Sequence, residues 1–355
     1  MIQNRSERSK DNNIGKASDK SASITSNTRP PTVLQVLPEL VTGGVERGTV
    51  DIAGAIVEGG GRAIVVSAGG PMAHELARSG AEHVTLPVHS KNPFVIQKNI
   101  HRLADLAVAE NVDIIHARSR ASAWSAMYAA KITGKNFITT FHGTYGHANS
   151  LKRAYNSVMT KGTLVIAISN FIAGHIRQVY GVPATNIRVI PRGVDLSRFN
   201  PEFVSRERII SLARKWRLPD GVPVIMLPGR LTRWKGQSIF IEAIKELGRK
   251  DVQCLIMGSD QGRHSYRREL ERFIESHGMT GNVHVIGHCD DMPAAYMLTD
   301  IVVSASLEPE AFGRVAAEAQ ALGRPVIASD HGGARETVIH GETGWLTPPG
   351  DAKAL

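Results

Sequence analysis

The stretch Pro223-Val-Ile-Met-Leu-Pro-Gly-Arg-Leu-Thr-Arg-Trp-Lys-Gly236 joins a short apolar strand to a basic loop bounded by glycines. Similar strands recur on both sides of it, and helical segments lie between most of them. This alternation predicts parallel sheets that are covered by helices on both faces. After the stretch, we expect strands at residues 252–257, 283–286, 301–304 and 325–328.

The first half of the chain shows the same alternation. Order is expected to begin at Pro31, with strands at residues 33–37, 63–67, 83–86, 112–116, 137–141, 164–168 and 187–190. The segment Pro191-Arg-Gly-Val-Asp-Leu-Ser-Arg-Phe-Asn-Pro201 is typical of a linker because prolines bound it and it contains a glycine. We therefore expect an α/β fold of two Rossmann-like, doubly wound domains, residues 31–198 and 199–355. They should share a central cleft at the carboxyl ends of their strands.

Composition excludes several classes of protein. The chain has 355 residues, of which 42% are hydrophobic and 21% charged, enough for two cores. Its net charge of +9 favours either an anionic partner or a solubilising surface. Only 5% of residues are aromatic and no recognition motif is present, which argues against nucleic acid. Cys254 and Cys289 lack metal-ligand spacing, so we expect no disulfide framework, no zinc site and a reducing cytoplasm.

The amino-terminal segment is polar. No apolar run approaches the roughly 20 residues that span a bilayer. The first 29 residues are rich in Ser, Asn and Lys and lack the apolar stretch of a secretory signal. We interpret residues 1–30 as a disordered tail. A transit peptide is the alternative, against which Glu7, Asp11 and Asp19 argue.

Two glycine-containing loops follow strands and carry candidate phosphate contacts. Gly43-Gly44 leads into an expected helix, where free backbone N–H groups can approach a phosphate; a plain strand-to-helix turn is the alternative. The spacing does not match G-x-G-x-x-G and no acid ends the second strand, which disfavours NAD. In the loop at 229–236, Arg230 and Lys235 supply cations that would stabilise a leaving diphosphate. A solvated basic loop is the alternative interpretation there.

The third motif is Glu308-Pro-Glu-Ala-Phe-Gly-Arg-Val-Ala-Ala-Glu318, which runs from a strand into a helix. Gly313 marks the helix entry, where the dipole favours an anion. Glu318 lies five residues further, about 7.5 Å along the helix axis, which suits a carboxylate that accepts ribose hydroxyls. Glu310 precedes the helix and is placed to receive hydroxyls of a sugar. An exposed acidic helix face is the alternative, and the apolar surroundings argue against it.

Together these motifs resemble glycosyltransferase family 4. The resemblance includes the linker Ile190-Pro-Arg-Gly-Val-Asp195 and the closing segment Gly341-Glu-Thr-Gly-Trp-Leu346, and it covers roughly residues 32–355. It implies the GT-B fold and a retaining, metal-independent transfer without a cofactor. It further implies that Arg230 and Lys235 hold the diphosphate, Glu318 the ribose, and Glu310 the donor sugar.

The resemblance also assigns the remaining contacts. It places His142, in Phe141-His-Gly143, near the donor sugar; a turn residue is the alternative. The catalytic residues it implies are Glu310, Arg230, Lys235 and His142. The donor-binding residues it implies are Gly43, Gly44, Arg230, Lys235, Glu310, Phe312, Gly313, Arg314, Val315 and Glu318.

The chain departs from the family pattern at two points. The linker carries Arg192 where family members usually have Asn, which is expected to alter contacts in the cleft. The sequence ends at Leu355, before the terminal helix that in such enzymes crosses back onto the first domain, so we expect residues 199–355 to lack that helix.

The acceptor is expected to bind the first domain. Residues 145–162 form a basic amphipathic segment that would contact an anionic membrane near a lipid-linked acceptor; an ordinary surface helix is the alternative. The basic and apolar residues of this segment are His147, Lys152, Arg153, Lys161, Leu151, Tyr155, Val158 and Met159.

The resemblance therefore implies a retaining hexosyltransferase that uses a nucleotide-sugar. The resemblance implies a glycan or lipid-linked acceptor in bacterial envelope polysaccharide or lipopolysaccharide synthesis. The expected location is the cytoplasm, with a peripheral position on the inner face of the plasma membrane as a variant. Two alternatives remain open: a sugar-nucleotide epimerase on the same fold and a non-catalytic nucleotide-sugar-binding protein.

Overall fold

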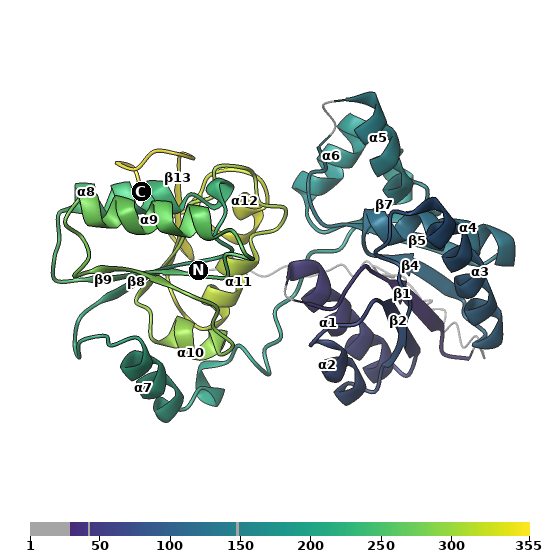
Figure 1. Ribbon diagram of the computed structural model, residues 1–355, viewed down its shortest axis with the longest axis horizontal. Helices are drawn as coiled ribbons and strands as arrows, with labels where there is room; N and C mark the ends of the chain where they lie inside the picture. Colours follow the sequence, from purple (N-terminus) through teal and green to yellow (C-terminus); the bar gives the residue numbers. More distant parts are fainter. Residues whose placement is uncertain (1–28, 42, 147–148) are drawn as a thin grey trace, which may run out of the picture. The chain divides into compact units, whose positions relative to one another are not determined.

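The computed structural model describes residues 29–41, 43–146 and 149–355. Residues Pro31–Leu355 form one compact unit that contains two parallel β-sheets, each flanked by helices (Figure 1). This confirms the expected α/β class with two doubly wound sheets. Because both sheets belong to one contact unit, the domain boundary between residues 198 and 199 stays a prediction. Most of the tail expected at residues 1–30, and His147, lie outside the described residues.

The first sheet contains seven strands in the order β3-β2-β1-β4-β5-β6-β7. The strands are β1 (Thr32–Val36), β2 (Arg62–Ser67), β3 (Glu82–Thr85), β4 (Ile114–Ala117), β5 (Asn136–Phe141), β6 (Leu164–Ala167) and β7 (Ile187–Val189). The α-helices of this half are α1 (Gly44–Glu58), α2 (Ala73–Arg78), α3 (Pro93–Ala109), α4 (Arg120–Thr133), α5 (Ser150–Asn156) and α6 (Asn170–Tyr180). Two 3₁₀ turns are η1 (Ser157–Thr160) and η2 (Ala184–Asn186).

The second sheet contains six strands in the order β10-β9-β8-β11-β12-β13. The strands are β8 (Val224–Pro228), β9 (Gln253–Met257), β10 (Val283–Ile286), β11 (Ile301–Ser304), β12 (Val326–Ser329) and β13 (Gly344–Thr347). The helical elements are η3 (Pro201–Phe203), α7 (Arg206–Lys215), η4 (Arg233–Lys235), α8 (Gln237–Leu247), α9 (His264–Ser276), α10 (Met292–Met297), α11 (Arg314–Ala321) and α12 (Ala334–Thr337). Strand β13 was not expected from the sequence, because Gly344-Trp-Leu-Thr347 is too short and mixed to show a pattern.

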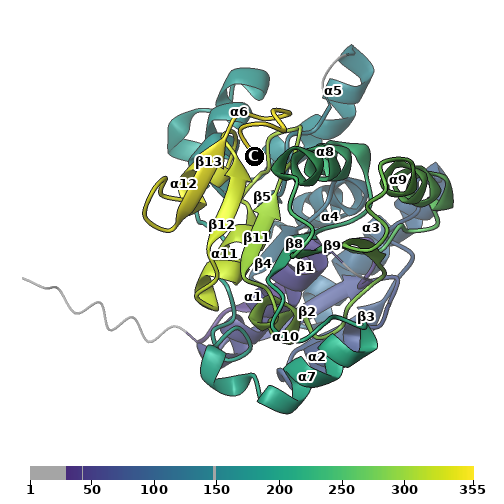
Figure 2. The same ribbon diagram turned by 90° about the vertical axis from the view of Figure 1, so that its left-hand side faces the viewer.

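The strand orders place one switch point in each sheet. In the first sheet, strands are added outward from β1 to β3 and then, from β4 on, along the other side of β1. In the second sheet, β8 and β11 are the corresponding neighbours, paired in parallel (Figure 2). In open α/β sheets, ligands bind beyond the carboxyl ends of the strands at such points. The loops after β1, β4, β8 and β11 are therefore where a ligand is expected.

The strands at the switch points are held by burial on both faces. All five residues of β1 are buried, as are four of the five residues of β8, because helices cover a parallel sheet on both sides. Cys254 and Cys289 are buried and free, so no disulfide joins them. In the parts of the chain that the structure describes, no helix is both long enough and apolar enough to cross a membrane.

Candidate active site

The switch point of the second sheet brings together residues that lie 75 positions apart in the chain. Lys235 ends the loop after β8, and Glu310 lies in the loop after β11. Their side chains form an ion pair between Nζ and Oε1. Only 13% of the Lys235 side chain and 16% of the Glu310 side chain are exposed, so solvent screens this pair weakly.

Glu310 is held as a carboxylate by several partners. Its Oε1 also accepts a hydrogen bond of 2.7 Å from Ser306 Oγ. Burial opposes ionisation, but the charge and hydrogen bond of Lys235, the Ser306 hydroxyl and the nearby His331 outweigh it and lower the pKa of Glu310. No described residue donates a hydrogen bond to the second oxygen, Oε2, which leaves an ionised acceptor for an incoming hydroxyl.

The helix that follows Glu310 begins at a glycine with a special backbone. Gly313 is the N-cap of α11 and adopts φ +89°. A Cβ at this position would lie 2.9 Å from Thr337 Oγ1, so both conformation and space require glycine. Among the residues that the structure describes, no side chain caps the start of α11. Its first N–H groups and the positive end of its dipole are therefore open to an anion.

Glu318 lies one turn into α11 and is fixed from two sides. Arg314 Nε donates to Oε1 at 2.6 Å, and Tyr296 Oη donates to Oε2 at 3.2 Å. Burial, followed by the charge of Glu318 and its hydrogen bond, raises the pKa of Tyr296 well above its usual value. The phenol therefore stays a donor. A carboxylate offers about four acceptor positions, so ribose hydroxyls can still bind beside these partners.

The other residues expected on this side have different surroundings. Arg230 is exposed, and its backbone oxygen accepts a hydrogen bond of 2.9 Å from Gln237 Nε2. Phe312 is only 9% exposed and packs into the core cluster of the first sheet, and Val315 packs into a core cluster of the second sheet. The structure thus places Phe312 and Val315 as packing residues beside the Gly313 helix start, while their assignment to the donor stays a prediction.

The switch point of the first sheet carries the remaining expected residues. Gly43 and Gly44 begin α1, and no described side chain caps this helix. Arg192, which follows β7, donates from Nη1 to the backbone oxygen of Gly44. Its Nη2 lies 2.5 Å from His142 Nδ1, in the loop after β5. The departure at Arg192 therefore ties the linker to both the glycine loop and His142.

His142 is neutral in this arrangement. A guanidinium can only donate, so Nδ1 is the acceptor and the ring proton resides on Nε2. Burial, followed by the charges of Arg192 and Arg118, lowers the pKa of His142 well below its usual value. Nε2 is buried and has no hydrogen-bond partner among the described residues. It is an N–H donor without an acceptor.

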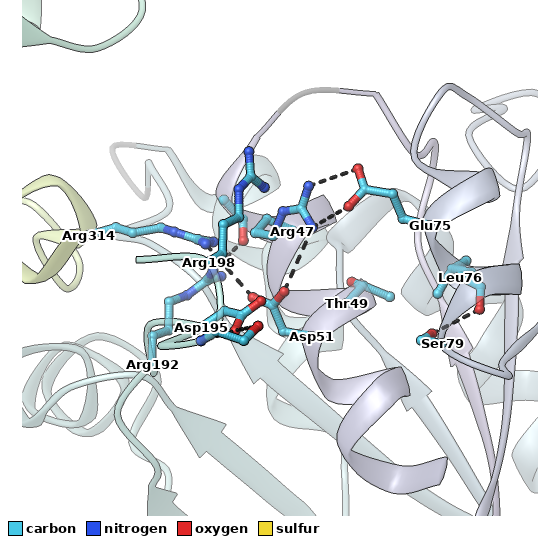
Figure 3. A network of polar contacts seen from close by, with 12 residues as sticks. Arg47, Thr49, Asp51, Glu75, Leu76, Ser79, Arg192, Asp195, Arg198 and Arg314 are labelled. Atoms are coloured by element: carbon cyan, nitrogen blue, oxygen red, sulfur yellow. Dashed lines mark hydrogen bonds and ion pairs between the residues drawn. The ribbon is translucent and has the colours of Figure 1, made fainter. Parts of the chain in front are cut away.

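A further arginine occupies the same switch point. Arg118 follows β4 and is only 4% exposed. Its Nε is buried without a hydrogen-bond partner among the described residues. Figure 3 shows the neighbouring polar network. The Asp51 carboxylate forms ion pairs with the guanidinium groups of Arg47 at 4.0 Å and Arg314 at 3.8 Å. Arg47 also donates two hydrogen bonds to the carboxylate of Glu75.

Sequence reasoning missed several of these residues. Ser306, His331 and Tyr296 support the two glutamates but carry no recognisable spacing signal, because they come from separate elements. Arg118 could have been found, since it follows a buried strand in His116-Ala-Arg-Ser-Arg120, as Arg230 follows β8. Among the described residues, no group of three or more His, Cys, Asp or Glu is placed to hold a metal ion. Metal independence stays a prediction.

The expected acceptor segment divides into two parts. Val158 and Met159 lie in η1 and are fully buried, so they belong to the core. In α5, Leu151 is 81% exposed and sits among basic residues. A pocket of about 480 Å³ borders this helix and is lined by Arg153, Lys161 and Tyr180, among others.

Two family profiles match the chain. "Glycosyl transferases group 1" matches residues 209–355, and "Glycosyltransferase Family 4" matches residues 42–198. A D-inositol 3-phosphate glycosyltransferase of Xylanimonas cellulosilytica is 28% identical over 264 residues, covering 68% of this chain and 61% of that protein. The chain therefore spans less than two thirds of the length of this curated relative.

Solved structures match over a larger share. A crystal structure of a glycosyltransferase from Rickettsia africae has a TM-score of 0.84 and 39% identity, covering 92% of this chain and 86% of that chain. Anabaena HepE in complex with UDP-glucose has a TM-score of 0.79 and 26% identity, covering 91% of this chain and 86% of that chain.

Proposed function

The chain belongs to the group 1 glycosyltransferases, with a family 4 amino-terminal half and the GT-B fold, and on this basis we propose that it transfers a sugar from a nucleotide-sugar donor with retention. The observation that carries this proposal is the Lys235–Glu310 pair at the switch point of the second sheet. It puts a cation for the diphosphate beside an ionised acceptor for the sugar. The complex of Anabaena HepE with UDP-glucose supports a nucleotide-sugar as the donor.

Each donor residue has a role that follows from its position. Arg230, exposed after β8, and Lys235 would bind the diphosphate, together with the free N–H groups at the start of α11. Glu310 Oε2 would accept a hydroxyl of the donor sugar, and Glu318 would accept ribose hydroxyls. The Nε2–H of His142 would donate to the sugar or its phosphate from the first sheet. Cations take the place of a metal in this proposal.

The chemistry we propose occurs on one face of the sugar. The bond between the anomeric carbon and the phosphate oxygen breaks as the acceptor oxygen bonds to the same carbon from the same side. The leaving phosphate oxygen takes the acceptor proton, so atoms and charge balance. Lys235 and the α11 amides stabilise the charge that grows on the diphosphate, which is where preorganised dipoles have their largest effect.

For the acceptor, we propose a glycan or lipid-linked molecule of the bacterial envelope, with the enzyme in the cytoplasm. The exposed Leu151 beside Lys152 and Arg153 supports a peripheral contact with an anionic membrane. Sedimentation with anionic liposomes at low and high salt tests this contact. Binding at low salt that is lost in L151E would support it, and no binding at low salt would end it.

The donor proposal is tested by calorimetry against a panel of UDP-, GDP- and ADP-sugars, followed by product analysis. We expect one nucleotide-sugar to bind, R230Q to weaken its binding by about tenfold, and the product anomer to match the donor. An isomerised donor without transfer would identify an epimerase, and binding without turnover a non-catalytic protein. If no nucleotide-sugar binds, the proposal is wrong.

A further inference from the structure

The first sheet has a buried cation, Arg118, that forms no ion pair with a described carboxylate. Arg118 is only 4% exposed, and the nearby carboxylate of Asp51 forms its ion pairs with Arg47 and Arg314 instead. Burial, followed by the charge of Arg192, lowers the pKa of Arg118 to about 9, and the charge of Asp51 offsets this only in part. A buried, unpaired charge is costly, so it persists where a ligand supplies the counter-charge.

A second arginine points at the same place. A Cβ on Gly48, in α1, would lie 2.9 Å from Arg192 Nη1 and 3.3 Å from Arg118 Nη2. Both guanidinium groups therefore border one glycine face near the start of α1. Burial, followed by the charge of Arg314, lowers the pKa of Arg192 to about 10, and Asp51 and Glu46 offset this only in part. By contrast, Arg47 and Arg314 already hold Glu75 and Glu318.

Three features converge here: the guanidinium group of Arg118, whose Nε has no hydrogen-bond partner among the described residues, the guanidinium group of Arg192, and the start of α1, which no described side chain caps. All three come from loops at the carboxyl edge of the first sheet. We propose that Arg118 and Arg192 form a second anion-binding subsite, which takes a phosphate or carboxylate group of the acceptor. This rests on the proposed function, in which Arg230, Lys235 and α11 already serve the donor diphosphate.

Inorganic phosphate is the probe for this subsite. It is titrated into the full chain saturated with whichever of UDP, GDP or ADP binds best, and followed by calorimetry. Sodium chloride at matched ionic strength controls for screening. We expect saturable phosphate binding in the wild type that is weakened about tenfold or more in R118Q. R192N, at a less buried position, should show the same loss, and R177Q, an exposed arginine on α6, should leave it within twofold.

The outcomes separate this proposal from the donor assignment. Unchanged phosphate binding in both R118Q and R192N would overturn the subsite. Phosphate binding that occurs only without nucleotide would show that these cations serve the donor diphosphate, and would overturn its assignment to the acceptor. Nucleotide affinity is read separately: it should be retained in R118Q and weakened about tenfold in R230Q. If the wild type binds no nucleotide, the proposed function fails, while phosphate binding to the free chain still tests Arg118.

Discussion

Both switch points carry a basic residue in a loop that follows a strand, but the two residues differ in whether a carboxylate pairs with them. Beside β8 and β11, Lys235 is paired with Glu310, so the site is internally balanced. Beside β1 and β4, Arg118 forms no ion pair with a described carboxylate, Arg192 adds a second positive charge, and Asp51 offsets the two charges only in part. An anion beside β8 and β11 must compete with the carboxylate of Glu310, whereas an anion beside β1 and β4 meets two arginines whose charge is only partly offset. Topology fixes where a ligand binds, and the partner of the basic residue decides how much of its charge is left for an anion.

The largest effect is expected when the acid of the balanced site loses its charge. E310Q keeps the shape of Glu310 but removes the ionised acceptor, so transfer should fall on the order of a thousandfold. Nucleotide affinity should change much less, because Arg230 and the α11 amides remain. Steady-state transfer and calorimetry of the free nucleotide separate these effects. E308Q, at an exposed neighbouring position, is the control, and full activity of E310Q would remove the central role of Glu310.

Removing the basic residue should have opposite effects on stability at the two sites. K235M leaves the largely buried Glu310 unpaired and should lower the free energy of unfolding by about 2 kcal/mol. R118M removes a buried charge that forms no ion pair with a described carboxylate, so the free energy of unfolding should stay the same or rise by about 1 kcal/mol. Urea unfolding without ligand measures both. Equal destabilisation by the two variants would show that Arg118 is compensated as well as Lys235 is, and the contrast would be lost.

The balanced site was more predictable from sequence than the unbalanced one. The positions of Arg230, Lys235 and Glu310 just after expected strands predict that they lie at one edge of the sheet, because the loops that follow parallel strands meet there. The same rule applies to Arg118. His142 and Arg192, however, follow strands β5 and β7, and only the strand order brings them to the same edge of the sheet as Arg118. That order is a tertiary property that no local pattern carries.

Other differences between expectation and structure have local causes. The sequence predicts one amphipathic segment over residues 145–162, but α5 ends at Asn156 and the 3₁₀ turn η1 follows. Val158 and Met159 in η1 are fully buried, whereas Leu151 in α5 is exposed. Phe312 packs into the core cluster of the first sheet, which the sequence did not indicate, while its assignment to the donor stays a prediction. The periodicity of a sequence shows which side chains form an apolar face, but it does not show which other element packs against that face.

The helix starts at the two sites differ in how strictly they require glycine. Gly313 has φ +89° and no room for a Cβ, so G313A should lower the free energy of unfolding by about 2 kcal/mol. Gly43 has an extended backbone with φ 168°, and a Cβ there would meet only the mobile end of Glu46. G43A should therefore cost under about 1 kcal/mol. Thermal unfolding of both variants tests this difference, and equal losses would contradict it.

The smallest expected effect concerns the ribose contact. E318Q keeps the size of Glu318 but removes its charge, which should weaken nucleotide binding about tenfold through the lost charge-assisted hydrogen bonds. It also frees Arg314, which lies 3.8 Å from Asp51 near the unbalanced site. Y296F is the matched control, because it removes one partner of Glu318 and keeps the carboxylate, so nucleotide affinity should stay within about threefold.

Phosphate titration of E318Q tests whether the two switch points influence each other. If the two switch points act independently, phosphate affinity at Arg118 is unchanged, whereas a stronger response would show that Arg314, released from Glu318, adds its charge to the anion subsite.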